Sequence, residues 1–486
     1  MKILNYTFLS ILGAFTFLGP GARGQSFESM LLKAKPPAAK KGFYAIRTFY
    51  KYSELRAYEL TLANGVHLVF RADEGRKDIL MTAVCPGGGS VADDKDFMSA
   101  MHAGAIVGNG GLGAFNGAET EKYFKQKNIT LSPGIDEKYS TLKGSFSRGN
   151  IETFMQALTL YFTSPRKDRD YFKTYIANLK KISAARQKDP YQVLEDTVKF
   201  LATRNKNRVN ILNMANINQI DLDKAYEIYR KCFGNAYGYT FIFTGDFKVD
   251  GMNQPSREAI DTLSKYLVAL PATADSQKII NRNTEIPNGR IVRKVYNGNA
   301  PLAAVHMIYS GEYQHSDSVN LQLKVLSYLL EKNLDTLDAF SGVSKPTVTL
   351  TLNKFPKEEY AINIAFKCSP QQAGKLVDIA QQTVKALHVE IRPEQLKQYV
   401  ALRKRELKSQ TFDYTFWLNY LELQFMNHDD PYDVAHYPYN FHKASQESLQ
   451  KAASQFFSGE NYIQATLLPS RQIKTGSTKP RTKKTI

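Results

Sequence analysis

The middle of the chain carries the same succession of elements twice, and this repeat limits the possible folds more than any other feature. Residues 128–147 and 347–368 each alternate polar and apolar side chains, which predicts two strands joined by a turn. The helices and the closing strand that follow come in the same order in both copies: 149–160, 171–187, 224–233 and 239–243, then 370–387, 394–409, 451–457 and 462–468. One shift in numbering places Phe172 on Leu396 and Tyr175 on Tyr399. The chain therefore predicts a duplicated domain.

Each copy opens with strands and a helix, at 58–83 with 97–107 and at 290–310 with 317–332. Runs of strands followed by runs of helices favour an α+β fold, with helices packed on one face of a largely antiparallel or mixed sheet, over a doubly wound parallel sheet. The polar, proline-bearing stretch 272–289 predicts a linker. We therefore predict two homologous domains, at residues 55–271 and 290–469.

The composition suits domains of this size. The chain has 486 residues, of which 43% are hydrophobic and 12% aromatic, so a disordered chain, a collagen and a disulfide-stapled miniprotein are excluded. Three cysteines allow one disulfide at most. Cys85, Cys232 and Cys368 all lie in apolar surroundings, which favours buried free thiols.

Residues 1–24 have the features of a signal peptide. Lys2 is followed by an uncharged apolar run at 3–18, and Ala22 and Gly24 stand at the small-residue positions of a cleavage site. A membrane anchor is the alternative, but the run is shorter than the roughly 20 residues that span a bilayer. We therefore expect export to the periplasm and removal of this segment. Residues 25–54 predict a lead-in segment outside the core, and we expect no transmembrane span in the mature protein.

The formal net charge is +18, and part of it lies in a basic tail at 470–486 that contains no acid. Such a tail is usually disordered and solvated; the alternative is contact with an acidic partner or a membrane surface. The lysine-rich helices at 171–188 and 394–409 either form solvated faces or line a cavity that attracts acidic peptides. No nucleic-acid-binding module is recognisable, so no nucleic-acid partner is expected.

Several short segments, taken in order, resemble the insulinase (pitrilysin) family of zinc metallopeptidases, in particular the non-catalytic C-terminal half of its fused bacterial members. They are residues 60–66 (LTLANGV), 86–88 (PGG), 111–113 (GLG), 129–133 (ITLSP), 161–166 (YFTSPR), 220–225 (IDLDKA), 241–247 (FIFTGDF) and 309–313 (YSGEY). The resemblance implies two insulinase-like α+β domains and a role in proteolysis.

The zinc site that marks active members of this family is missing from the sequence. Their motif is His-x-x-Glu-His on the first helix, with a further Glu on a later helix; two imidazoles and a carboxylate bind zinc, and the Glu of the motif activates water. The resemblance places the first His on His102, but the Glu on Ala105 and the second His on Ile106. The helix at 171–188 has no acid. We therefore expect no catalytic residue, no metal and no cofactor in this chain. His102 is either a vestige of the site or an ordinary buried histidine.

Because of this loss, we expect the chain not to be an enzyme on its own. The resemblance implies pairing with an active zinc-peptidase subunit, which alone holds zinc, in a peptide-degrading clamshell. It also implies that peptides add as a strand to a sheet edge. That edge would be formed by Ile129, Thr130, Leu131, Ser132, Pro133, Gly134 and Ile135.

Two alternatives remain at this point. The positions of the substrate-clamping Arg and Tyr of other inactive halves fall on Leu337 and Ser344, which puts the usual clamping role in doubt. The chain could instead be a stand-alone exported scaffold that binds peptides or proteins. A working metallopeptidase with unconventional ligands is the third hypothesis.

Overall fold

The computed structural model describes residues 26–36, 46–73, 75–248, 257–298, 300, 302–340 and 344–470. The predicted signal peptide at 1–24 and residues 471–486 of the predicted basic tail lie outside the described residues.

The first domain is built on a mixed sheet of seven strands in the order β1-β2-β3-β9-β4-β8-β7. Neighbours are antiparallel except β3 and β9, which run parallel. The strands are β1 (Ile46–Tyr52), β2 (Ala57–Leu62), β3 (His67–Ala72), β4 (Ile79–Pro86), β7 (Thr130–Ile135), β8 (Tyr139–Phe146) and β9 (Thr240–Gly245). One face of this sheet and its helices enclose the larger hydrophobic core. The helices are α2 (Phe97–Gly108), α3 (Gly117–Gln126), α4 (Ile151–Thr163), α5 (Arg169–Lys188), α7 (Met214–Ile217), α8 (Leu222–Phe233) and α9 (Arg257–Val268).

Residues 25–54 are predicted to be a lead-in segment outside the core, but the structure places part of this segment in the core. Helix α1 (Phe27–Lys33) buries Phe27, Met30 and Leu31 in the core of the first domain. These three side chains share one helical face because they are spaced at i, i+3 and i+4. Strand β1 then pairs with β2 at the edge of the sheet. Part of the stretch 25–54 thus belongs to the first domain.

The second domain repeats this topology with five strands, in the order β10-β14-β11-β13-β12. The order corresponds to β3-β9-β4-β8-β7 of the first sheet, and here too the first pair, β10 and β14, is the parallel one. The strands are β10 (Arg290–Tyr296), β11 (Ala303–Glu312), β12 (Thr347–Asn353), β13 (Glu359–Cys368) and β14 (Tyr462–Leu468). The helices are α10 (Asp317–Asp335), α11 (Ala373–Ala386), α12 (Pro393–Gln410), α14 (Asp433–Asn440) and α15 (Gln446–Phe456). The predicted α+β class is confirmed.

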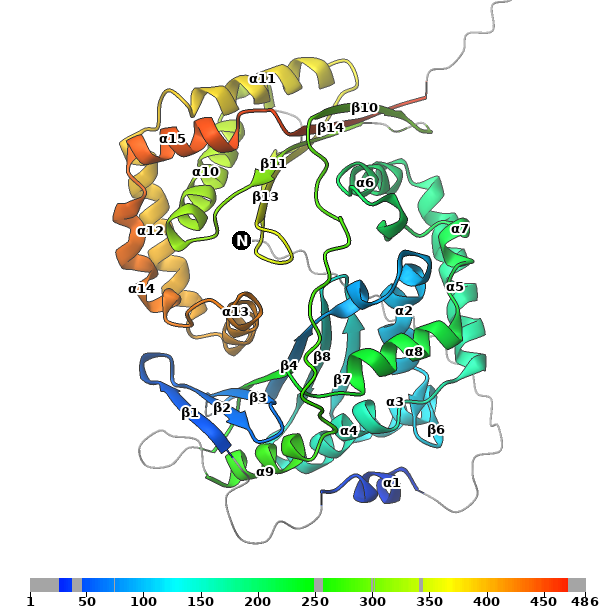
Figure 1. Ribbon diagram of the computed structural model, residues 1–486. Coiled ribbons are helices and arrows are strands. Elements are labelled where there is room, and N and C mark those ends of the chain that lie inside the picture. The colour runs from blue at the N-terminus through cyan, green and yellow to red at the C-terminus, as the bar shows by residue number, and fades with distance from the viewer. Residues whose placement is uncertain are drawn as a thin grey trace, which may run out of the picture.

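Two helices cross between the domains (Figure 1). Helix α6 (Pro190–Leu201) lies between α5 and α7 of the first domain, yet its Leu194 packs with Ile308 and Ile463 of the second sheet. Helix α13 (Tyr414–Asn427) belongs to the second domain, yet its Leu421 packs with Val69 and Ile242 of the first sheet. Each domain therefore covers the open sheet face of the other.

A carboxylate on each crossing helix reaches a polar group on the opposite sheet. Glu422 of α13 accepts a hydrogen bond from Thr82 Oγ1 at 2.9 Å and pairs with Lys143 Nζ at 3.0 Å. Glu195 of α6 lies 3.2 Å from His306 Nε2, and this hydrogen bond holds the pKa of Glu195 below its usual range. The two domains are thus joined by polar contacts as well as by apolar packing.

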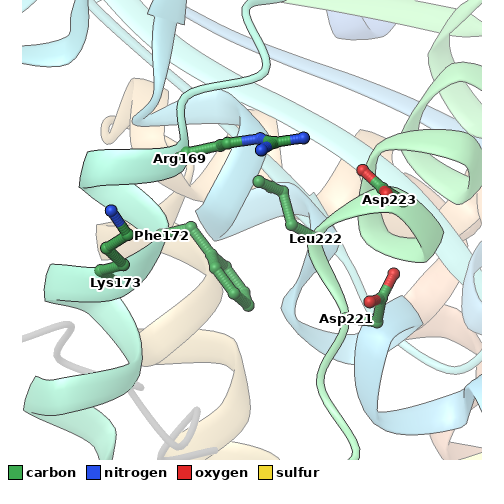
Figure 2. Close-up of a pocket in the computed structure, with 6 residues that line it drawn as sticks. All are labelled: Arg169, Phe172, Lys173, Asp221, Leu222 and Asp223. Atoms are coloured by element: carbon green, nitrogen blue, oxygen red, sulfur yellow. The ribbon is translucent and has the colours of Figure 1, made fainter.

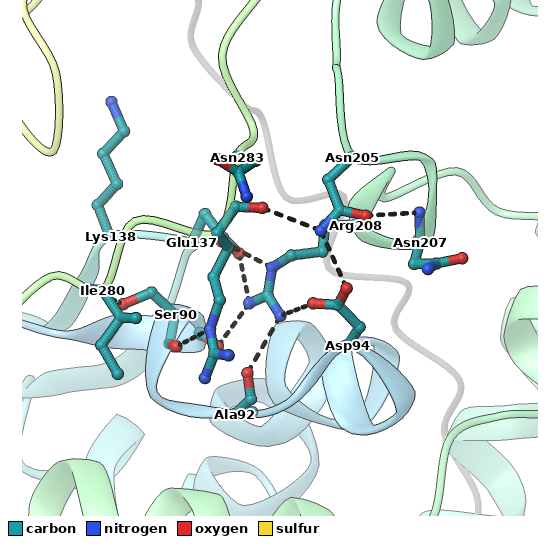
Figure 3. A network of polar contacts seen from close by, with 12 residues as sticks. Ser90, Ala92, Asp94, Glu137, Lys138, Asn205, Asn207, Arg208, Ile280 and Asn283 are labelled. Carbon is teal, nitrogen blue, oxygen red and sulfur yellow. Dashed lines mark hydrogen bonds and ion pairs between the residues drawn. The ribbon is translucent and has the colours of Figure 1, made fainter.

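The centre of a polar network under the linker is Arg208, whose side chain is fully buried (Figure 3). Its guanidinium donates to both carboxylate oxygens of Glu137, at 2.8 and 3.0 Å, and to Asp94 at 3.2 Å. It also donates to the carbonyl oxygens of Gly89, at 2.8 Å, and Ala92, at 3.1 Å. All five N–H donors of the guanidinium are therefore used.

The predicted linker at 272–289 is docked beside this network. The backbone N–H of Ile280 donates to Ser90 Oγ at 2.9 Å, and Arg282 Nε donates to the Ser90 carbonyl at 2.8 Å. The backbone N–H of Asn205 donates to the carbonyl of Asn283 at 2.9 Å. The segment between the domains is thus bound along its length to the first domain.

The three cysteines are buried and free, as predicted. Burial raises the pKa of Cys85 to about 12 and that of Cys232 to about 11. Both thiols are therefore protonated and chemically inert at neutral pH.

Candidate functional site

His102 lies on α2, a helix with apolar or small residues at nearly every position, most of them buried. The imidazole is buried, and its Nδ1 lies 2.8 Å from the hydroxyl of Tyr175 on α5. The other ring nitrogen, Nε2, has no hydrogen-bond partner among the described residues. Burial lowers the pKa of His102 to about 4, so the ring is neutral at physiological pH.

The groups around His102 do not fit a catalytic zinc ion, which takes three protein ligands and an open position. One turn further along α2, Ala105 and Ile106 offer no ligand atom. From helix α5 the hydroxyl of Tyr175, not a carboxylate, lies beside the imidazole. Across the part of the chain that the structure describes, no group of three or more His, Cys, Asp or Glu side chains could hold a metal.

Tyr175 aligns with Tyr399 in the repeat, but no sequence signal connects it to His102. The hydroxyl of Tyr399 lies 3.0 Å from that of Tyr437. The same shift places His102 on Leu326, which is fully buried in α10. The aligned position in the second domain thus carries a buried apolar side chain in place of the imidazole, which favours a structural role for the His102–Tyr175 pair.

The predicted peptide-binding segment forms the edge strand β7, which among the described strands pairs with β8 alone. Thr130 and Ser132 are exposed, whereas Leu131 and Ile135 are buried. Ile129 precedes the strand and is also buried. Pro133 and Gly134, the other residues of the segment, lie against α2. Because proline lacks an N–H, Pro133 is compatible with an edge position.

Small side chains at paired positions of β7 and β8 leave a hollow on the open face of the sheet. Thr130 pairs with Ser145 of β8, which in turn pairs with Leu80 of β4. Leu418 of α13 closes the inner end. The resulting cavity has a volume of about 360 Å³ and is lined by Leu80, Met81, Thr130, Leu131, Ser132, Lys143, Gly144, Ser145, Leu418 and Asn419. An apolar side chain of a peptide bound at β7 could enter it.

A second hollow, of about 270 Å³, lies at the first turns of α5 and α8 (Figure 2). Phe172 and Leu222 form its apolar part. Arg169 and Lys173 line it from α5, and Asp221 and Asp223 line it from the other side. Asp221 caps α8 by accepting from the N–H of Lys224, and Asp223 pairs with Lys167. These carboxylates are occupied in structural contacts, so the hollow offers no general base.

Comparisons with known proteins agree with this geometry. No family model matches the sequence. The zinc protease PQQL-like protein of Arabidopsis thaliana is 22% identical over 366 residues, which cover 70% of this chain and 34% of that protein. The periplasmic protease PqqL from Escherichia coli superposes with a TM-score of 0.76 at 18% identity, covering 95% of this chain and 49% of that one. A peptidase M16 inactive domain from Pseudomonas fluorescens superposes with a TM-score of 0.69 at 11% identity, covering 85% of this chain and 98% of that one.

The chain has the insulinase-type peptidase fold. The resemblance inferred from the sequence is thereby confirmed, including its likeness to non-catalytic halves of this family. The chain spans about a third of the Arabidopsis protein and about half of PqqL. Within the described residues of this insulinase-type chain, no helix is both long and apolar enough to cross a membrane.

The buried imidazole of His102 makes the stability of the fold depend on pH. Its folded pKa of about 4 lies below the ordinary value of about 6.5, so unfolding takes up a proton between these two values. Stability is therefore lost as the pH falls from about 6.5 to about 4. We expect the unfolding free energy of the wild type to fall by about 2 kcal/mol more than that of His102→Gln between pH 7 and pH 4.5. Urea unfolding at the two pH values measures this difference.

The control is His436→Gln, which replaces an exposed imidazole. Its loss of stability on acidification should match that of the wild type. Equal losses for His102→Gln and the wild type would contradict a buried, neutral His102.

Proposed function

We propose that the chain is a catalytically inactive insulinase-type half that pairs with an active zinc-peptidase half on another polypeptide. The observation that carries the proposal is the position of His102. Its neighbours Ala105 and Ile106 cannot bind metal or activate water, and its imidazole is held by Tyr175. Zinc and water activation then belong to the partner subunit.

The substrate contact that we propose for this half is the β7 edge. Addition of a peptide strand there would place alternate side chains on the open sheet face, beside the cavity between Ser145 and Leu418. PqqL from Escherichia coli is a periplasmic protease, which supports our proposal of a periplasmic location for this chain as well.

The test mixes this chain with a purified insulinase-type half that carries an intact His-x-x-Glu-His motif and is encoded by the same genome. We expect a defined heterodimer on size exclusion. We also expect hydrolysis of a fluorogenic peptide at about tenfold the rate of the active half alone, because two halves orient the peptide together. This chain alone should show no cleavage above background, with or without added zinc.

Variants at the cavity test the substrate contact. Ser145→Tyr fills the hollow and should raise the KM of the mixture several-fold while the heterodimer still forms. Ser145→Ala keeps the hollow open and serves as the matched control. Chelator-sensitive cleavage by this chain alone would contradict the proposal. A monomer that binds peptides but never the active half would favour the stand-alone scaffold.

A further inference from the structure

Strand β10 is an edge strand that is exposed over most of its length. It pairs with β14 on one side, and no described strand lies on its other side. Ile291 and Val295 are half-buried against the apolar cluster around α6. On the opposite face, Val292 is 53% exposed and Tyr296 is 48% exposed. This edge presents unpaired backbone groups and apolar side chains together.

The duplicated topology shows what is missing at this edge. In the first domain the equivalent strand is β3, which is buried at five of its six positions. Strand β2 pairs with the outer edge of β3 in antiparallel fashion, and α9 contacts β2. Among the described residues, the second domain has no counterpart of β2. Strand β10 is thus left open where its homologue is covered.

The charge of the strand limits which segment could cover it. One face of β10 carries, in chain order, Arg290, Val292, Lys294 and Tyr296, so cationic and apolar side chains alternate on it. Arg290 stacks on the ring of Tyr462 at 4.5 Å. Arg293 and Lys294 form no ion pair with any described residue, and residues 286–298 contain no acid.

Like charges directly opposite one another destabilise paired strands, whereas opposite charges stabilise them. A second copy of β10 is therefore disfavoured. The chain's own C-terminal segment leaves from Ser470, whose N–H donates to the Gly298 carbonyl at 2.8 Å, but residues 471–486 carry six Lys and Arg and no acid. The charge of β10 therefore favours an acidic segment of another protein as the occupant.

We propose that the β10 edge is a docking site for an extended acidic segment of a partner protein, which adds as an antiparallel strand in the position that β2 occupies in the first domain. Acidic side chains of the segment lie opposite Arg290 and Lys294, and apolar side chains lie opposite Val292 and Tyr296. The site is separate from the β7 edge, so its failure would leave the proposed peptidase pairing intact.

The test uses the full chain and the fluorescein-labelled peptide Val-Thr-Glu-Thr-Val-Thr-Glu-Thr, which in antiparallel pairing places Glu opposite Arg290 and Lys294 and Val opposite Val292 and Tyr296. Fluorescence anisotropy should show saturable binding that weakens with added salt. The variant Lys294→Glu should weaken binding about tenfold, because an attraction becomes a repulsion. Lys51→Glu, an exposed reversal on the edge strand β1, is the matched control and should leave the affinity unchanged.

Two further measurements locate the peptide. Hydrogen exchange of residues 290–296 should slow on binding, and the peptide with Lys in place of Glu should not bind. Absence of saturable binding, or equal affinity for Lys294→Glu and the wild type, would overturn the proposal. Binding that appears only after removal of residues 471–486 would also overturn it, because the edge would then belong to the chain's own C-terminal segment.

Discussion

Replacing Arg208 with methionine is expected to cost the protein about 3–5 kcal/mol of unfolding free energy, which is the usual cost of removing one partner from a buried ion pair. The substitution keeps much of the side-chain volume but removes all five N–H donors. It leaves Glu137 without its cation and the carbonyls of Gly89 and Ala92 without a donor. Urea unfolding followed by circular dichroism measures the loss.

The matched control is Arg293→Met, the same change at an exposed arginine that pairs with no described residue. It should shift the unfolding free energy by less than about 0.5 kcal/mol. Removal of the Arg208 guanidinium should also release the linker, since Asn205 and Asp94 join the Arg208 network to the linker. Limited proteolysis at residues 272–289 should therefore accelerate in Arg208→Met. A loss below about 1 kcal/mol would show that the network is not a structural centre.

Truncating Leu421 to alanine is expected to cost about 2–5 kcal/mol, because it opens a cavity between α13 and the first sheet. Leu421 is fully buried against Val69 and Ile242. The single tryptophan of the chain, Trp417, lies one turn earlier on α13 and packs with Tyr52 and Leu55 of the first domain. Its fluorescence therefore reports directly on this interface during urea unfolding.

Leu423→Ala is the matched control on the same helix. Leu423 is 48% exposed, so its truncation should cost less than about 0.5 kcal/mol. Leu194→Ala on α6 should resemble Leu421→Ala, since Leu194 is equally buried on the other crossing helix. Equal midpoints for Leu421→Ala and Leu423→Ala would contradict a tight domain interface.

The duplication was readable because alternation and helical periodicity are local signals. The hairpins β7–β8 and β12–β13 occupy the predicted segments 128–147 and 347–368. The position of β9 between β3 and β4 was not readable, because its pairing joins segments that are far apart in sequence. The crossing of α6 and α13 was missed for the same reason, although the apolar surface of α13 on all sides is typical of a buried helix.

The site around His102 could likewise be predicted only in part from the sequence. The replacement of zinc-binding positions by Ala105 and Ile106 follows from residue identity alone, once the resemblance sets the alignment. The contact between His102 and Tyr175 depends on how α2 and α5 pack, and no spacing along the chain predicts it. The α1 helix had a local signal in Phe27, Met30 and Leu31, which the neighbouring lysines and prolines obscured.

The exchange of α6 and α13 has the geometry of an isologous dimer whose two subunits became joined in one polypeptide. Each repeat offers the same pair of complementary surfaces, a sheet face and a helix, and in the described part of the chain each surface packs against the other repeat. A fragment ending before residue 272 would expose both surfaces at once. Such a fragment has a built-in tendency to pair with itself, with the symmetry that the fused chain retains only approximately.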